Sequence, residues 1–158
     1  MALVVETGEG LPDAEAYISV ADADKYHADR GNAAWGELAE PAKEAALRRG
    51  ADYLGAAYAS RWCGHRLTDG QALDWPRTGR DGVPVAIARM NAELAMRSLT
   101  GPLMADEGAA VQSETVGPIS VTYAKGNAGA VRYTAVESAL RAAGLFCVRP
   151  GFIPAVRA

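Results

Sequence analysis

The sequence predicts a mainly α-helical fold: a small bundle of three to four helices with an inserted β-hairpin and extended N- and C-terminal arms. Hydrophobic residues make up 49% of the chain but aromatic residues only 7%, and Ala-rich, Leu-spaced segments favour closely packed helices over a thick sheet core. One segment, Val111–Tyr123, breaks the helical pattern with β-forming residues. The 158 residues predict one domain, 1–158, whose helical core spans about 19–100 and 131–144.

The N-terminal part of the chain predicts an extended lead followed by a short helix. Residues 1–18 contain glycines and a proline that interrupt any helix. Ser19 followed three residues later by Asp22 resembles a capping arrangement, and the helix that it opens is expected to end at Gly31. A loop that carries Trp35 should follow.

Two longer helices form the centre of the predicted bundle. The first runs from Pro41 to about Tyr58, since proline is accepted in the first turn of a helix. The second runs from Pro84 to about Leu99 and is stopped by Gly101-Pro102. Each has one apolar stripe at helical spacing. The stripes are Leu47, Ala51, Leu54 and Tyr58 in the first helix and Ile87, Ala88, Leu94, Ala95 and Leu99 in the second.

A long irregular connection, residues 60–82, joins these helices and contains two tryptophans among several arginines. Interleaved rings and cations are typical of single-stranded nucleic-acid binding. In the alternative interpretation, which we favour, the two rings hold the loop on the helical core while the arginines bridge to carboxylates. The structural candidates in this loop are Trp62, Trp75, Pro76 and Arg77.

The segment 111–123 predicts a β-hairpin with a tight turn at Gly117-Pro118. In this register Thr115 faces Ser120, and Val116 faces Ile119. Neither face is apolar enough to fill a core, and an isolated hairpin is marginally stable in water. It must therefore lie on its own helices or on another subunit. The candidate interface residues are Val111, Glu114, Val116, Ile119, Val121 and Tyr123.

The C-terminal part predicts one more helix and an apolar arm. Thr134 and Glu137 form a capping-box pattern for a helix that ends at Gly144. The segment 145–158 is too apolar for a solvated tail, so we expect it to dock on its own body or on a neighbour. Its candidate contact residues are Phe146, Arg149, Phe152, Ile153 and Arg157.

Charge is divided unevenly along the chain. Residues 1–124 carry 11 Lys and Arg against 18 Asp and Glu, a balance of −7, whereas residues 125–158 carry 5 against 1, a balance of +4. An acidic body with a basic arm suits head-to-tail contacts between copies or docking on an acidic partner. Ordinary surface variation explains the division equally well. The net charge of −3 disfavours a dedicated nucleic-acid binder.

Catalytic, metal and cofactor sites find little support in the sequence. Cys63 and His65 could seed a zinc or thiol site, but the other candidates, His27 and Cys147, are isolated in the chain. No phosphate-binding glycine motif is present. We therefore expect no enzymatic activity, metal or cofactor. The alternative is an active site assembled from residues that form no recognisable motif. We also expect two free thiols, no membrane span and synthesis in the cytoplasm.

Four segments together resemble one phage and prophage family: VVETGEGLPDAEAYISVADADKYHADRG, AKEAALRRGADYL, QALDWPRTG and SETVGPISVTYA. Members of this family are often labelled DnaT-like single-stranded-DNA-binding proteins, and they are similar to the head–tail connector, or adaptor, proteins of long-tailed phages and gene-transfer particles. The resemblance covers nearly the whole chain. It is most specific at 73–77 and 116–119 and weak in the C-terminal tail.

The resemblance implies a virion protein of the phage neck that forms a ring, a dodecamer, beneath the portal protein. Such a ring extends the DNA channel, lets DNA pass without specific binding, and presents a surface to a tail or stopper protein. The hairpin would then reach a neighbouring copy or the tail-side partner, and the arm 145–158 would insert into the portal. The alternative is a single-stranded-DNA-binding module of DnaT-like type.

Overall fold

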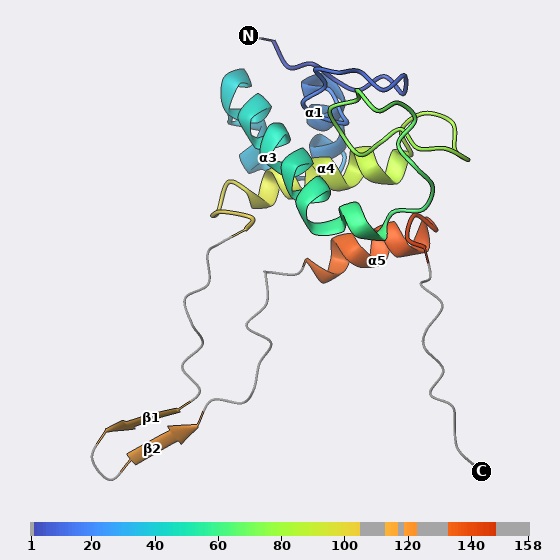
Figure 1. Ribbon diagram of the computed structural model, residues 1–158. Coiled ribbons are helices and arrows are strands. Elements are labelled where there is room, and N and C mark those ends of the chain that lie inside the picture. The colour runs from blue at the N-terminus through green and yellow to red at the C-terminus, as the bar shows by residue number, and fades with distance from the viewer. Residues whose placement is uncertain (1, 105–112, 117–118, 123–132, 148–158) are drawn as a thin grey trace, which may run out of the picture.

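The computed structural model (Figure 1) describes residues 2–104, 113–116, 119–122 and 133–147. Most of the described residues that lie in regular elements are helical, so the prediction of a mainly helical fold is confirmed. The helices are α1 (Val20–Ala28), α2 (Ala33–Gly36), α3 (Glu40–Tyr58), a 3₁₀ turn η1 (Ala59–Arg61), α4 (Val85–Arg97) and α5 (Thr134–Ala142). Two strands, β1 (Ser113–Val116) and β2 (Ile119–Thr122), complete the elements.

Strands β1 and β2 pair antiparallel, with Thr115 opposite Ser120 and Val116 opposite Ile119. The turn residues 117–118, the connections 105–112 and 123–132, and the side chains of both strands lie outside the described part of the chain. The predicted role of this hairpin as an inserted contact element therefore stays a prediction.

Helix α4 is the centre of the helical body, because α1, α3 and α5 all contact it. Figure 1 shows α1 on one side of α4 and α5 on the opposite side. Two apolar clusters fill the spaces between the helices. One includes Leu54, Ile87 and Leu140 and joins α3, α4 and α5. The other includes Leu47, Trp35 and Ala92 and joins α2 and α3 to the opposite side of α4.

A buried asparagine fastens the N-terminal segment to these helices. The Oδ1 atom of Asn91 accepts a hydrogen bond from the backbone N–H of Tyr17 at 2.9 Å, and its Nδ2 donates to the carbonyl of Leu47 at 2.8 Å. Gly50 permits this close packing, since a Cβ there would lie 2.6 Å from Asn91 Nδ2. The segment just before Tyr17 pairs with the N-terminus through a parallel bridge between Val5 and Ala16.

The helix caps predicted from the sequence are only partly present in the structure. The predicted capping at Ser19 is confirmed, because its side chain accepts from the N–H of Asp22 at 3.1 Å. The predicted capping box at Thr134 is wrong: Thr134 is the first residue of α5, and the cap position is Tyr133 without a side-chain hydrogen bond. The Glu137 carboxylate instead forms ion pairs with Arg61 and Arg141. The loop expected around Trp35 contains the short helix α2, a single turn that the pattern does not reveal.

The expectation of two free thiols is also wrong, because Cys63 and Cys147 form a disulfide with their Cα atoms 4.8 Å apart. Tertiary packing overrides their separation of 84 residues. Backbone pairing brings the two segments together, with Trp62 and Phe146 forming an antiparallel bridge. Phe146, predicted as a contact residue of the C-terminal arm, packs against the ring of Trp62 at 5.1 Å between centroids.

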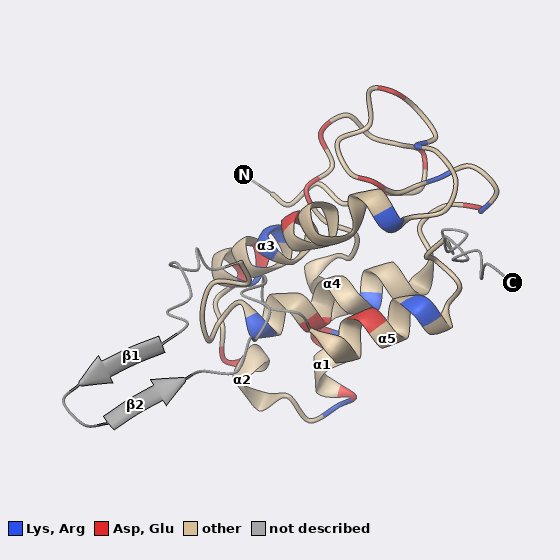
Figure 2. Cartoon of the chain, turned by 60° about the horizontal axis from the view of Figure 1, so that its bottom comes forward, with Lys and Arg blue, Asp and Glu red and all other residues tan. Residues whose placement is uncertain are grey.

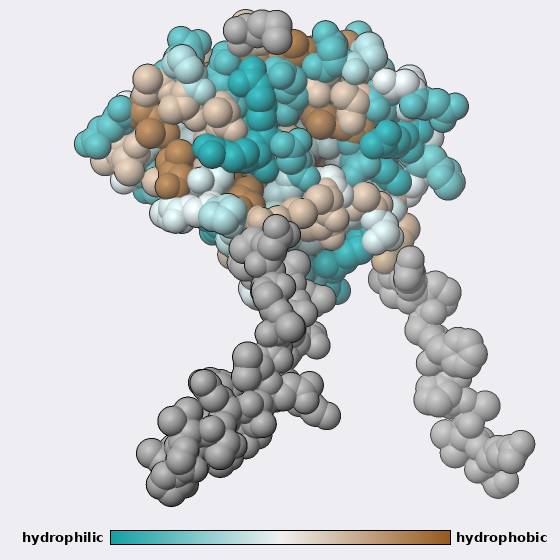
Figure 3. Space-filling view, turned by 60° about the vertical axis from the view of Figure 1, so that its left-hand side comes forward, coloured by the Kyte–Doolittle hydropathy of each residue, from teal (hydrophilic) through white to brown (hydrophobic). Residues whose placement is uncertain are grey.

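The surface of the described body is of mixed charge. Lys and Arg alternate with Asp and Glu along the helices and loops, without a continuous basic run in the view of Figure 2. On the face shown in Figure 3, hydrophobic residues form several small patches separated by hydrophilic ones. Within the described residues, no helix combines the length and the hydropathy needed to cross a bilayer.

Candidate functional site: the tryptophan loop and the groove between α1 and α4

The tryptophan loop, residues 60–82, folds back on the helical core. Trp62 is 6% exposed and Trp75 is 1% exposed, which leaves neither ring a free face. The two indole rings meet edge to face with their centroids 5.8 Å apart. Trp62 also contacts Tyr58 and Phe146. A base could stack on either tryptophan only if the loop detached from the core.

Buried hydrogen bonds fix the centre of this loop. The hydroxyl oxygen of Tyr17 accepts from the backbone N–H groups of Asp74, at 3.0 Å, and of Trp75, at 3.3 Å. The Asp74 carboxylate accepts from Trp62 Nε1 at 3.2 Å and pairs with Arg66 at 3.2 Å. Burial raises the pKa of the Tyr17 hydroxyl, which stays a neutral acceptor at physiological pH. The Trp75–Pro76 peptide bond within this segment is cis.

The arginines of the loop are bound to the protein itself. Arg77, only 8% exposed, donates from Nε to the carbonyl of Cys63 at 2.9 Å and from Nη2 to the carbonyl of Gly64. Arg61 pairs with Glu137 at 2.7 Å, and Arg80 donates to the carbonyl of Gly144. Arg61 and Arg66 are thus paired with carboxylates, and Arg77 and Arg80 donate to backbone carbonyls that position the loop.

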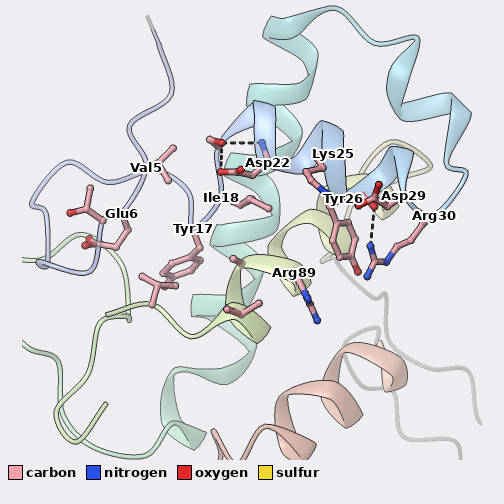
Figure 4. A pocket seen from close by; sticks show the side chains of 15 residues that line it. Val5, Glu6, Tyr17, Ile18, Asp22, Lys25, Tyr26, Asp29, Arg30 and Arg89 are labelled. Carbon is pink, nitrogen blue, oxygen red and sulfur yellow. Dashed lines mark hydrogen bonds and ion pairs between the residues drawn. The ribbon is translucent and has the colours of Figure 1, made fainter. Parts of the chain in front are cut away.

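A groove of about 490 Å³ lies beside α1 (Figure 4). The N-terminal segment around Val5, the outer face of α1 and the first turns of α4 line it. The α1 residues Asp22 and Tyr26 face it at helical spacing, and Arg30 joins them from the turn that follows the helix. Arg89 enters from α4.

Tyr26 and the cations around it are the polar part of this groove. The guanidinium of Arg30 lies 3.6 Å from the centroid of the Tyr26 ring, and the Tyr26 hydroxyl donates to Glu93 at 3.0 Å. Burial raises the pKa of Tyr26, and the Glu93 carboxylate raises it further. Arg89 is exposed and has no ion-pair partner among the described residues.

The charge of the groove is balanced. Lys25 pairs with Asp29 at 3.1 Å, and the carboxylate of Glu6 accepts hydrogen bonds from three backbone N–H groups of residues 8–11. Tyr26 and Arg89 are two side chains that a ligand in this groove would contact. The groove lacks the surplus of free cations expected of a strong polyanion site.

A second hollow of about 380 Å³ lies beside Trp35, between α1 and α2. Its polar rim is satisfied internally, since Asp24 accepts from Trp35 Nε1 at 2.7 Å and pairs with Lys43 at 2.9 Å. His27 is buried beneath it and accepts a hydrogen bond at Nδ1 from the Asn32 amide. Burial lowers the pKa of His27, which favours the neutral ring. The described residues contain no group of three His, Cys, Asp or Glu side chains placed to hold a metal ion.

The structure brings together only part of the residues that the sequence singles out. Trp62, Trp75, Pro76 and Arg77 lie together in the loop. The hairpin residues Val111 and Tyr123 and the arm residues of 148–158 lie outside the described residues, as do the side chains of the strands. The sequence reasoning missed the groove. The sequence shows that Tyr26 and Arg30 are four residues apart, a spacing that places two side chains close together. It does not show that Arg89, 59 positions after Arg30, lies in the same groove, because the tertiary fold brings it there.

Comparison with known proteins gives one family. The family model described as "Putative DnaT-like ssDNA binding protein" matches residues 1–158, the whole chain. Searches of curated proteins and of solved structures gave no significant match.

Proposed function

The chain belongs to the family described as putative DnaT-like ssDNA-binding proteins, and we propose that it serves as a structural protein of a phage-type particle, a head–tail connector. The main support for this proposal is that the tryptophan loop is packed on the helical body. Both of its indole rings are buried, and its arginines are bound to carbonyls and carboxylates of the same chain. The loop that most resembled a DNA-binding element thus serves to hold the body together.

The division of charge supports contacts between proteins. The basic residues Lys125, Arg132, Arg149 and Arg157 lie in segments without an acidic residue, 123–132 and 148–158. The rest of the chain carries the acidic excess. Two different complementary surfaces on each copy are what closure of a ring by head-to-tail contacts requires. An acidic ring wall would also repel phosphate and let DNA slide through the channel.

In this proposal each end of the ring has its own contact element. The hairpin 111–123 reaches a neighbouring copy or a tail or stopper protein, and strand addition is one way to bind it. The C-terminal arm inserts into the portal protein. Because Leu145 is fully buried and Phe146 packs on Trp62, both belong to the helical body, and we assign portal docking to residues 148–158. Phe152 and Ile153 supply their apolar anchors.

Binding of single-stranded DNA is the second candidate, and the description of the family favours it. We assign this activity to the groove beside Tyr26, since the ring of Tyr26 and Arg89, which has no ion-pair partner among the described residues, both line it. A base stacked on an aromatic ring contributes about 1–3 kcal/mol, and phosphate contacts make binding depend steeply on salt.

One pair of experiments separates the two candidates. Tagged full-length protein is purified from particle-producing cells, and its partners are identified by mass spectrometry. Recovery of portal and tail proteins in ring-sized complexes is expected, and a variant that ends at Cys147 should stay folded but lose the portal. Arg149→Gln with Arg157→Gln should weaken portal recovery, whereas Arg49→Gln, on the exposed face of α3, should not.

The second experiment measures binding of a labelled oligonucleotide at low and moderate salt. The connector proposal expects weak binding that Tyr26→Ala does not change. Tight binding that falls steeply with salt, and that is lost in Tyr26→Ala and Arg89→Ala but not in Arg49→Ala, would overturn it in favour of the second candidate. Recovery of replication proteins without particle proteins would do the same.

A further inference from the structure

The disulfide between Cys63 and Cys147 closes a short antiparallel pairing of two distant segments. The N–H of Cys63 donates to the carbonyl of Leu145 at 3.0 Å, and the N–H of Cys147 donates to the carbonyl of Arg61 at 3.0 Å. Cys147 is the last residue before the C-terminal segment 148–158. The bond therefore sits at the root of that segment.

The two sides of the bond are held differently. Cys63 lies in a loop that Arg77 fixes by donating to the carbonyls of Cys63 and Gly64. Gly64 has φ +73°, and a Cβ there would lie 2.5 Å from the carbonyl oxygen of Thr78, so this turn is tightly packed. On the other side, Cys147 is exposed and follows the last buried contacts of the described chain, those of Leu145 and Phe146.

The disulfide is also accessible and lies outside the apolar core. Cys147 is exposed and Cys63 half-buried, whereas the rings beneath them are covered. Thiol–disulfide exchange needs direct access of an attacking thiolate to a sulfur, which this position allows. Neither cysteine belongs to the two apolar clusters that join the helices. Breaking the bond thus removes a tether at the edge of the body and leaves the core contacts in place.

We propose that the Cys63–Cys147 disulfide is a redox-controlled clamp that fixes the root of the C-terminal segment to the tryptophan loop. A low-molecular-weight disulfide such as oxidised glutathione closes it. One cysteine thiolate attacks that disulfide and releases one glutathione thiolate. The second cysteine thiolate then attacks the mixed disulfide and releases the other. Two cysteine thiols and one oxidised glutathione give one protein disulfide and two glutathione thiols, and a reducing thiol reverses both steps.

The clamp controls where the chain leaves the body at Cys147. When it is closed, the pairing of 145–147 with 61–63 cannot open without breaking a covalent bond. When it is open, the pairing is held without a covalent bond. Two backbone hydrogen bonds, the packing of Leu145 and Phe146, and the Arg61 guanidinium 4.2 Å from the Phe146 ring centroid remain. Local opening of such a short pairing is then expected while the helices stay folded. This inference stands apart from the proposed function, since it concerns the body alone.

The test uses the full-length protein in glutathione buffers of increasing oxidised fraction. Acid quenching followed by a maleimide–polyethylene glycol reagent counts the free thiols. Both thiols should disappear together in a single two-electron transition. Hydrogen exchange then compares the two forms at the amides of Cys63 and Cys147. We expect at least tenfold faster exchange at these two amides in the reduced form, with the amides of Leu94 and Ala95 in α4 still protected in both forms.

The double variant Cys63→Ala, Cys147→Ala is the matched control, and it should behave like the reduced wild type in every buffer. Thiols that stay reactive in excess oxidised glutathione would overturn the proposal. So would equal exchange at Cys147 in both forms. Loss of protection throughout α3 and α4 on reduction would also overturn it, because the disulfide would then be a staple of the whole fold.

Discussion

The hydroxyl group of Tyr17 gives the sharpest test of how the tryptophan loop is held. Tyr17 is 4% exposed, and its oxygen accepts from the N–H groups of Asp74 and Trp75. The substitution Tyr17→Phe keeps the ring and removes only this acceptor. Both N–H groups are then left buried and unpaired, because the phenylalanine ring occupies the same space.

The expected cost follows from the two bonds. A buried donor that loses its partner costs about 1–3 kcal/mol, and the longer bond to Trp75, at 3.3 Å, contributes the smaller share. We therefore expect Tyr17→Phe to lower the free energy of unfolding by about 2–4 kcal/mol. For a domain of this size the melting temperature should fall by about 4–16 °C.

The assay is urea unfolding followed by tryptophan fluorescence, with hydrogen exchange at the amides of Asp74 and Trp75 as a local readout. The control is Tyr26→Phe, which removes a hydroxyl that donates to Glu93 at the edge of the groove. It should cost less than Tyr17→Phe, because Glu93 keeps its ion pair with Arg97 at 2.7 Å. If Tyr17→Phe changes stability by less than about 0.5 kcal/mol, the loop does not depend on this contact. The packing of Trp62 and Trp75 and the hydrogen bonds of Arg77 would then hold the loop without the Tyr17 hydroxyl.

Three further predictions concern the disulfide and two titrating groups. Cys63→Ala, which removes the cross-link to Cys147, should lower the free energy of unfolding by about 2–4 kcal/mol under oxidising conditions and change little under reducing ones, as measured in urea. Burial lowers the pKa of His27 in the folded protein, so the unfolded chain binds more protons below about pH 6.5. The free energy of unfolding should therefore decrease as pH falls through this range. His27→Gln should reduce this pH dependence of the melting temperature. Hydrogen bonding from Arg61 lowers the pKa of Glu137, so the stability that it contributes is present above about pH 4.5 and lost as pH falls further; Glu137→Gln should remove this acid-dependent part.

Local pattern determined where the long helices lie. The apolar stripe that includes Leu47 and Leu54 places the core-facing side of α3, and the stripe that includes Ile87 and Leu94 places that of α4. Pro41 and Pro84 mark the starts of these helices to within one residue. These signals work because a helix is defined by contacts three and four positions apart, which are all present in the local sequence.

The same local reasoning failed where a distant partner competes for a side chain. Glu137 has the spacing of a capping box with Thr134, yet Arg61 and Arg141 bind its carboxylate, at 2.7 and 3.0 Å. An ion pair with Arg61 also joins α5 to the turn after α3, which a local cap cannot do. The interaction across 76 residues therefore replaces the one across three.

The sequence by itself determined a mainly helical, Ala-rich body with an uneven division of charge and a family resemblance. Only the tertiary structure decided what its unusual residues do. It paired Cys63 with Cys147, buried Trp62 and Trp75, and brought Arg89 beside Tyr26. The physical reason is that each of these outcomes joins parts of the chain that no local periodicity connects. Burial of the apolar stripes sets how the helices pack, and that packing then selects the distant contacts.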